Sequence, residues 1–137
     1  MTAHPSAVLA DAATASSIPV CDHYCGVHSR MVKSLAMQRE FSEEFGACVF
    51  DVTLDLEDGA PVGGERDHAE MVSELARSTL SAPGSHDRRV AVRLHPVDHA
   101  CFEQDAQIVL GQAASSLCHV MLPKVESVAQ QIGRAHV

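Results

Sequence analysis

The sequence predicts an α/β fold with one parallel sheet, and three features carry that prediction. Short segments in which apolar and polar residues alternate are typical of strands, longer segments with apolar residues about four apart are typical of helices, and turns rich in Gly and Pro separate the two. Strands that alternate with helices are joined by right-handed crossovers, so we expect the strands to run parallel.

The first regular element is a short apolar run at residues 18–21, which we expect to be a strand. A helix is predicted from about Ser29 to Phe45, with Ser29 as its N-terminal cap and Gly46 at its end. Residues 1–17 are rich in Ala, Ser and Thr and are expected to form a flexible leader. The apolar residues of the helix share one face: Met31, Leu35, Phe41 and Phe45.

Residues 48–58 alternate strictly between apolar and polar side chains. Because a strand has a period of two, one face is apolar and the other mainly acidic. An edge strand facing water explains this pattern, and so does a strand whose polar side forms a site; both interpretations stay open at this point. The apolar set is Phe50, Val52, Leu54 and Leu56, and the polar set is Asp51, Thr53, Asp55 and Glu57.

The same alternation of elements continues to the end of the chain. Strands with charged polar sides do not suit an open sheet covered by helices on both faces, whereas a barrel with a polar interior accommodates them. We therefore expect a partial TIM (β/α)8 barrel, about the first four βα units, over residues 18–131. The later elements are a helix at 65–80, a strand at 89–95, a helix at 98–114 that buries Phe102, Ala106 and Val109, a strand at 117–122 and a helix that opens at 123.

Four strands are half of the eight that such a barrel needs, so we expect a sequence that has been cut. The last six residues, 132–137, match the translation of a common short-read sequencing adapter, and we expect a non-native tail there. Comparison of the coding DNA with genomic DNA tests this expectation.

Composition argues against several classes of partner. A net charge of −8 and the lack of any Lys/Arg run longer than Arg88-Arg89 argue against nucleic acid and anionic membranes. No apolar stretch approaches the roughly 20 residues that span a bilayer, and the chain does not begin as a secretory signal does, so a cytoplasmic protein is expected. The five cysteines are an odd number, and we interpret them as reduced thiols in or near the core.

Ionisable residues gather at the predicted carboxyl ends of the strands, where parallel α/β folds place their active sites. Neighbouring carboxylates repel one another unless a cation offsets them, and their oxygens favour Mg²⁺. Arg93 offers a planar fork suited to a carboxylate, with His95 on the same side; alternatively it bridges to Asp55 or Glu57 structurally, and both interpretations can hold. The residues are Asp55, Glu57, Asp58, Arg93, His95, Lys124 and Glu126.

Three segments at these strand ends carry a family resemblance: Leu54-Asp55-Leu56-Glu57-Asp58-Gly59-Ala60-Pro61, Val92-Arg93-Leu94-His95-Pro96-Val97-Asp98 and Met121-Leu122-Pro123-Lys124-Val125-Glu126-Ser127. In this order they resemble the citrate lyase beta subunit and HpcH/HpaI aldolase family, over about residues 18–130. The resemblance implies the front half of a Mg²⁺-dependent TIM-barrel lyase or aldolase. Such enzymes act on 2-oxo or 2-hydroxy carboxylic acids or their CoA thioesters, and commonly form homo-oligomers.

The resemblance also implies roles for individual residues. Arg93 is expected to hold the substrate carboxylate, with His95 and Lys124 also in the substrate site. Glu57 and Asp58 are expected to be the catalytic acidic pair beside the metal and its waters. The direct metal ligands of the family follow its fifth and sixth strands, so we expect this chain by itself to be inactive.

Several alternatives stay open. A non-catalytic acidic module could hold Mg²⁺ in an open five-stranded sheet, and a half-barrel with two free sheet edges would aggregate or dimerise. Residues 22–26 stand where many relatives carry a Pro-Gly-Ser-type loop, which leaves the use of a thioester open. A zinc site is disfavoured because no second ligand pair follows the first cluster; that cluster is Cys21, His23, Cys25 and His28.

Overall fold

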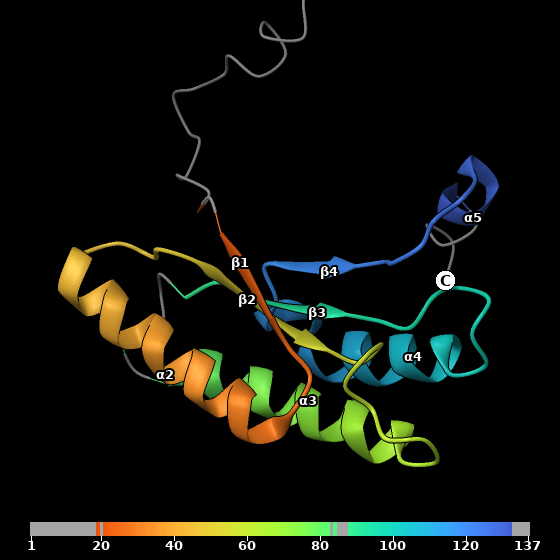
Figure 1. The fold of residues 1–137 in the computed structure, drawn as a ribbon, viewed down its shortest axis with the longest axis horizontal. Coiled ribbons are helices and arrows are strands. Elements are labelled where there is room, and N and C mark those ends of the chain that lie inside the picture. Colours follow the sequence, from red (N-terminus) through yellow and green to blue (C-terminus); the bar gives the residue numbers. More distant parts are fainter. Residues whose placement is uncertain (1–18, 20, 83, 85–87, 133–137) are drawn as a thin grey trace, which may run out of the picture.

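The computed structural model describes residue 19, residues 21–82, residue 84 and residues 88–132 (Figure 1). The predicted leader lies outside this range, as does the predicted tail apart from Ile132. The elements are β1 (Asp22–Cys25), α2 (His28–Phe45), β2 (Asp51–Asp55), α3 (Glu65–Ser81), β3 (Val90–Arg93), α4 (Phe102–Ala113), the 3₁₀ helix η1 (Ala114–Ser116), β4 (His119–Met121) and α5 (Val128–Ile132).

The four strands form one parallel sheet in the order β1-β2-β3-β4. This confirms the α/β prediction, and it is consistent with part of a barrel, in which neighbours in sequence are neighbours in the sheet. An open doubly wound sheet reverses its strand order at a switch point. The described strands show no reversal, which counts against the open acidic module.

The strands are shorter than predicted, and the first is displaced. The first described strand begins at Asp22, and Cys21 precedes it, so the prediction of a strand at 18–21 is wrong for Cys21; residues 18 and 20 are outside the described range. Residues 22–26 are therefore mostly strand, where the sequence suggested a loop. The apolar pattern indicates which side chains can be buried, whereas a strand begins and ends where a neighbouring backbone can pair with it. Here the pairing of β1 with β2 begins with Asp22 beside Asp51.

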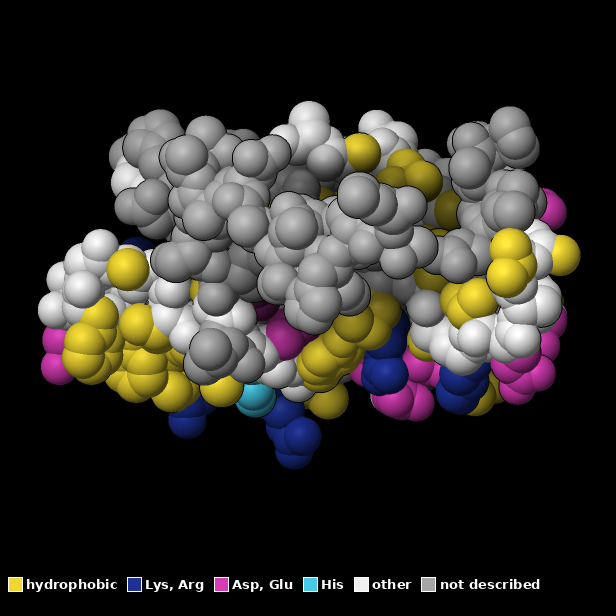
Figure 2. Space-filling view, turned by 90° about the horizontal axis from the view of Figure 1, so that it is seen from above, with side chains coloured by type: hydrophobic (Ala, Val, Ile, Leu, Met, Phe, Trp, Pro, Cys, Tyr) yellow, Lys and Arg dark blue, Asp and Glu magenta, His cyan; other side chains and the backbone are white. Residues whose placement is uncertain are grey.

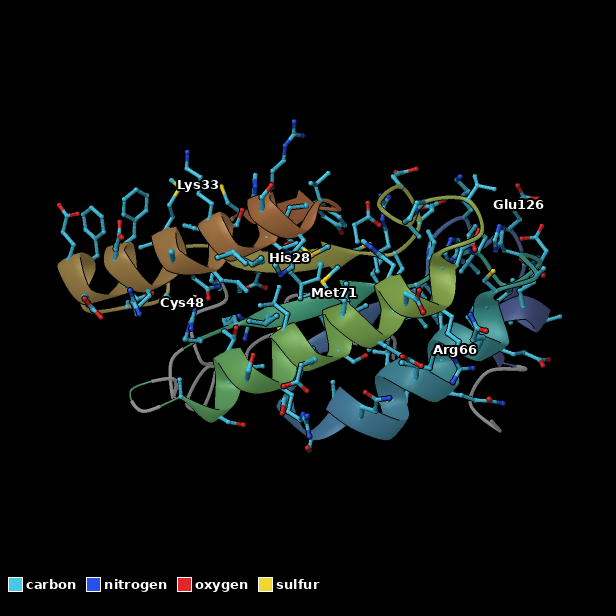
Figure 3. All side chains as sticks on the ribbon, turned by 90° about the horizontal axis from the view of Figure 1, so that it is seen from below. His28, Lys33, Cys48, Arg66, Met71 and Glu126 are labelled. Atoms are coloured by element: carbon cyan, nitrogen blue, oxygen red, sulfur yellow. The ribbon has the colours of Figure 1, made fainter. Side chains whose placement is uncertain are left out.

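Helices α2, α3 and α4 cover one face of the sheet, as the ribbon shows from the side and from below (Figures 1 and 3). The core lies between them and the apolar face of β2 and β3. Its fully buried members include Met31, Val52, Leu54, Val72, Val90, Val92 and Val109.

The prediction of one apolar face on α2 is correct for two of its four residues. Met31 and Leu35 are buried, whereas Phe41 and Phe45 are exposed, Phe45 by 65%. Near the sheet the next buried position is Gln38, whose amide donates to the carbonyls of Phe50 and Arg89 at 2.9 and 2.8 Å. The hydrophobic side chains at the left of Figure 2 lie over the end of α2.

Helix ends agree with the sequence at one terminus of α2 and differ at others. Gly46 ends α2 in the left-handed conformation, φ 69°, with its N–H bonded to the Ser42 carbonyl. Ser29 is not the cap, since the helix begins at His28 without a side-chain cap. α4 begins at Phe102 and not at Asp98, because residues 96–102 form two turns, each with a backbone hydrogen bond, before the helix starts. α5 begins at Val128 and not at 123.

The polar face of β2 is not an edge. β2 pairs with β1 on one side and β3 on the other, so the interpretation of an edge strand facing water is wrong. Asp51, Thr53 and Asp55 instead face away from the helices, and partners on β1 and β3 hold them: Thr53 donates to Asp22, while Arg89 and Arg93 donate to the two aspartates. This face carries both clusters described below.

Two general features follow from the described residues. No helix within them is long and apolar enough to cross a membrane. All five cysteines are free thiols, as expected, but their placement differs from the prediction: Cys25 is buried, Cys48 and Cys101 are half-buried, and Cys21 and Cys118 are exposed.

Candidate functional site

Arg93, the last residue of β3, is the centre of an ion-pair cluster at the carboxyl ends of the strands. Its Nε and Nη2 donate to the two carboxylate oxygens of Asp55 at 2.8 and 2.6 Å. Nη2 also donates to Asp58 Oδ2 at 2.6 Å, and Nη1 lies 3.0 Å from Glu57 Oε2. The hydrogen bond to Asp55 is the main cause that raises the pKa of Arg93, so the guanidinium stays charged.

The turn after β2 brings Glu57 and Asp58 to Arg93. Asp55 Oδ1 accepts the N–H of Glu57 at 3.0 Å, and the Asp55 carbonyl accepts from the buried His68 of α3 at 3.1 Å. The side chain of Glu57 is 6% exposed and that of Asp58 is 72% exposed. One carboxylate is therefore fixed inside the cluster, while the other can move into solvent.

Two glycines hold this turn against the loop after β1. A Cβ on Gly59 would lie 2.4 Å from the Asp55 carbonyl oxygen and 2.5 Å from Gly26 Cα. Only residues without a side chain allow such an approach of two backbones. No role was predicted for these glycines from the sequence, although Gly59 lies inside a motif that carries the resemblance.

Lys124 reaches the cluster from the segment after β4. Its Nζ lies 2.6 Å from Glu57 Oε1, and the pairing with Glu57 raises the pKa of Lys124. The contacts of Glu57 with Lys124 and Arg93 are ion pairs without hydrogen-bond alignment. Lys124 adopts φ 52°, uncommon for a residue with a side chain, and its side chain is 69% exposed.

Tyr24 belongs to this cluster and was missed from the sequence. Arg93 Cζ lies 5.2 Å from the centre of its ring, within cation–π range, and its hydroxyl donates to Met121 Sδ at 2.7 Å. Burial is the main cause that raises the pKa of Tyr24. The expected start of β1 was four residues early, which removed the signal that Tyr24 sits near a strand end.

His95 and Glu126 do not join Arg93 in the described contacts. His95 Nδ1 lies 2.5 Å from Asp105 Oδ2 on α4, and the backbone N–H of His95 donates to the same oxygen at 3.2 Å. The His95 ring stacks on the ring of His99, with 4.3 Å between the ring centroids. β3 ends at Arg93, so strand alternation does not extend to His95. Glu126 is exposed, at the right of Figure 3.

The cluster's charges are offset by protein cations. Asp55, Glu57 and Asp58 face Arg93 and Lys124, so three carboxylates meet two cations. These carboxylates therefore need a divalent ion less than the sequence suggested. Within the described residues no three ligand atoms converge on a metal position at this end; Glu57 and Asp58 fit a role in holding the waters of a metal ion rather than the ion itself.

The cluster Cys21, His23, Cys25 and His28 is not assembled as a metal site in the described residues. Cys25 is buried against the helices, whereas Cys21 and His23 are exposed. The residues that do converge are Asp51, Cys118 and His119, at the opposite ends of the strands.

The chain is similar to a solved structure of a citrate lyase from Burkholderia xenovorans LB400. The two share 38% sequence identity with a TM-score of 0.73, over 88% of this chain. No protein-family model and no curated protein matches the chain. Because the match covers 35% of the citrate lyase, this chain spans about a third of that protein's length. The similarity supports the citrate lyase resemblance and the barrel-like arrangement at a coarse level.

Proposed function

We propose that the chain is part of a Mg²⁺-dependent carbon–carbon lyase or aldolase of the citrate lyase beta subunit and HpcH/HpaI type. Its substrates would be 2-oxo or 2-hydroxy carboxylic acids or their CoA thioesters. The observation that carries the proposal is Arg93, presented at a strand end with one solvent-exposed carboxylate on its guanidinium. The 38% identity to a citrate lyase points to the same chemistry.

Arg93 is suited to bind a substrate carboxylate because its own position is fixed. Asp55 accepts two of its N–H groups, and the Arg93 side chain is 20% exposed. Asp58 occupies a further N–H of Nη2 from a largely exposed side chain. A substrate carboxylate can replace Asp58 there, since an exposed ion pair contributes little free energy.

Lys124 and His95 complete the proposed substrate site in different ways. Lys124 can turn from Glu57 toward a second anionic group, because its ammonium is exposed. His95 is bound to Asp105, so we assign it to holding the loop after β3 in place beside Arg93.

Mg²⁺ enters the proposal through Glu57 and Asp58. These two carboxylates would accept hydrogen bonds from the waters of the ion, with its direct ligands on further strands of a complete barrel. When bound, the ion would supply Lewis-acid stabilisation for the enolate that cleavage releases. The residues of this chain would bind and orient the carboxylate that neighbours the broken bond.

The proposal is tested on the product of the complete reading frame in the source genome. We expect Mg²⁺-dependent cleavage of citryl- or malyl-type thioesters or of free 2-hydroxy acids. Arg93→Gln should lower kcat/KM by about a hundredfold, because a carboxylate loses its charged partner, while Arg93→Lys should retain part of the activity. The control is Arg66→Gln, which removes an exposed arginine of α3 paired with Glu70.

A second readout uses this chain itself. Oxaloacetate, as a small 2-oxo dicarboxylate, should bind with an affinity that Arg93→Gln reduces and Arg66→Gln leaves unchanged. The proposal would be refuted if the complete product cleaved none of these substrates and Arg93→Gln left the affinity for oxaloacetate unchanged.

A further inference from the structure

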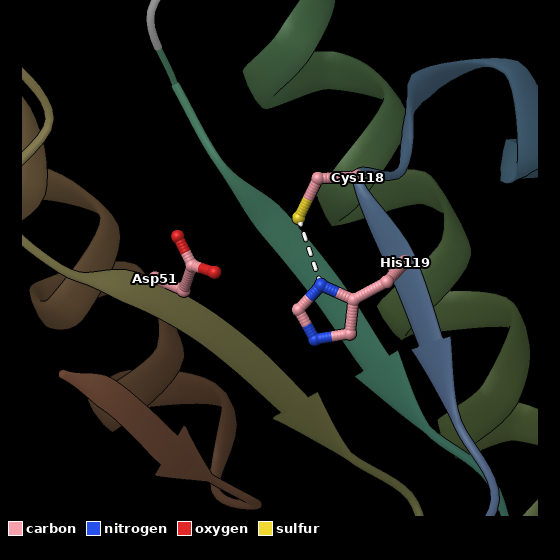
Figure 4. Close-up of side chains that lie close together, drawn as sticks. All are labelled: Asp51, Cys118 and His119. Carbon is pink, nitrogen blue, oxygen red and sulfur yellow. Dashed lines mark hydrogen bonds between the residues drawn. The ribbon is translucent and has the colours of Figure 1, made fainter. Parts of the chain in front are cut away.

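We propose that Asp51, Cys118 and His119 form a zinc site at the amino-terminal ends of the strands. One ligand atom from each residue lies within 4.8 Å of the other two. Figure 4 shows the three side chains turned toward one another, with the Cys118 thiol 3.3 Å from His119 Nδ1. The site lies at the opposite end of β2 from Asp55, and the inference does not rest on the proposed lyase function.

The sheet explains how residues from two non-adjacent strands meet. Asp51 opens β2, and Cys118 and His119 stand at the start of β4, with β3 between them. The β3 residue beside His119 is Ala91, fully buried on the polar face. Its small side chain leaves room for the flanking residues to reach across β3, which a larger residue would fill.

Partners outside the three ligands already orient them. Arg89 Nε donates to Asp51 Oδ1 at 2.6 Å and Nη2 to Oδ2 at 3.2 Å, which fixes the carboxylate and leaves lone pairs free. Asp22 Oδ2 lies 4.0 Å from His119 Nε2, and Thr53 donates to Asp22 at 2.9 Å. Zinc-bound histidines usually present their second ring nitrogen to such a carboxylate.

The ligand types select the metal. A thiolate, an imidazole and a carboxylate suit Zn²⁺, whereas Mg²⁺ prefers oxygen ligands only. Three protein ligands leave the fourth tetrahedral position to water. With the thiol ionised, Asp22, Asp51 and Cys118 set three negative charges against the single positive charge of Arg89, so a divalent cation balances the group.

The test uses the chain purified without metal and titrated with Co²⁺ and Zn²⁺. Co²⁺ should bind one per chain and give the absorption of a cobalt–thiolate bond, which one equivalent of Zn²⁺ removes. Cys118→Ser should abolish this absorption and weaken Zn²⁺ binding by more than about tenfold. Cys101→Ser, the same change at a half-buried cysteine outside the cluster, should alter neither.

His119→Gln keeps the test decisive if a cysteine variant is hard to prepare. It should retain the cobalt–thiolate absorption with lower intensity and weaken Zn²⁺ binding by more than about tenfold. Circular dichroism establishes that each variant is folded before it is titrated. Absorption that survives Cys118→Ser or disappears in Cys101→Ser would overturn the proposal, as would binding below one Zn²⁺ per chain.

Discussion

The two ends of the sheet carry the same ion pair with different neighbours. Arg89, the residue before β3, pairs with Asp51 at the start of β2, and Arg93 pairs with Asp55 at the ends of the two strands. The two pairs are four positions apart along each strand, or roughly 13 Å at about 3.3 Å per residue. At the far end two more carboxylates and a lysine surround the arginine, whereas at the near end a thiol and an imidazole stand beside the aspartate.

This difference decides which ligand each end can take. At the Arg93 end the exposed Asp58 occupies a donor that another carboxylate can take over, so the proposed ligand is an anion. At the Arg89 end the described contacts of the arginine with acidic residues are with Asp51, and ligand atoms of Asp51, Cys118 and His119 lie within 4.8 Å of one another, so the proposed ligand is a cation. An arginine–aspartate pair therefore supports either function, according to what surrounds it.

The largest expected effect comes from breaking the pair at the Arg93 end. Arg93→Gln should lower the free energy of unfolding by about 3 kcal/mol, because the buried Asp55 loses its cation and Glu57 keeps only Lys124. Urea denaturation measures the change. Asp55→Asn in the same chain should recover most of the loss, since it removes the stranded charge and keeps the acceptor for the Glu57 N–H. A double variant no more stable than Arg93→Gln would contradict this account.

A smaller loss should follow from pushing apart the loops that position this end. Gly59→Ala places a methyl group 2.4 Å from the Asp55 carbonyl oxygen and 2.5 Å from Gly26 Cα, and both neighbours are backbone. We expect a loss of about 2 kcal/mol of unfolding free energy. Oxaloacetate binding should also weaken, because a displaced Asp55 backbone moves the carboxylate that fixes the guanidinium of Arg93. Unchanged stability would mean that the two loops do not touch in solution.

The sequence predicted more of the Arg93 end than of the Arg89 end, for a physical reason. Parallel strands place their carboxyl ends together, so Asp55, Glu57, Asp58, Arg93 and Lys124 could be grouped from their positions after strands. The structure brings these five together. The extent of each strand could not be predicted, because side-chain alternation does not reveal where the backbone partner ends.

Residues that depend on register were missed for that reason. Tyr24 and Ala91 matter because of the residues beside them in neighbouring strands, and register is fixed only when the sheet forms. Cys118 was expected in or near the core because it lies in an apolar run, but it precedes β4 and its thiol contacts His119. His95 was grouped with Arg93 by an alternation that ends two residues earlier.

Breaking the pair at the Arg89 end should have a moderate effect on stability and a specific one on metal binding. Arg89→Gln removes the charged hydrogen bonds to Asp51, and we expect a loss of about 1.5 kcal/mol of unfolding free energy. Zn²⁺ affinity should fall by about tenfold, because the Asp51 carboxylate loses its orientation. Isothermal titration calorimetry measures the affinity. If Arg89→Gln instead raised the affinity for Zn²⁺, the repulsion between the Arg89 charge and the metal would outweigh the role of Arg89 in positioning Asp51.

The smallest expected effect is a gain in stability from a change outside the Arg93 and Arg89 clusters. Gly111 lies inside α4, and a Cβ there would meet nothing within 4 Å. Gly111→Ala should raise the free energy of unfolding by about 0.7 kcal/mol, because alanine loses less backbone freedom than glycine on entering a helix. Oxaloacetate and Zn²⁺ affinities should stay at their original values. If either affinity changed together with stability, stability alone would be enough to shift ligand binding. The losses of affinity expected from Gly59→Ala and Arg89→Gln would then have to be corrected for their changes in stability before they are assigned to one end of the sheet.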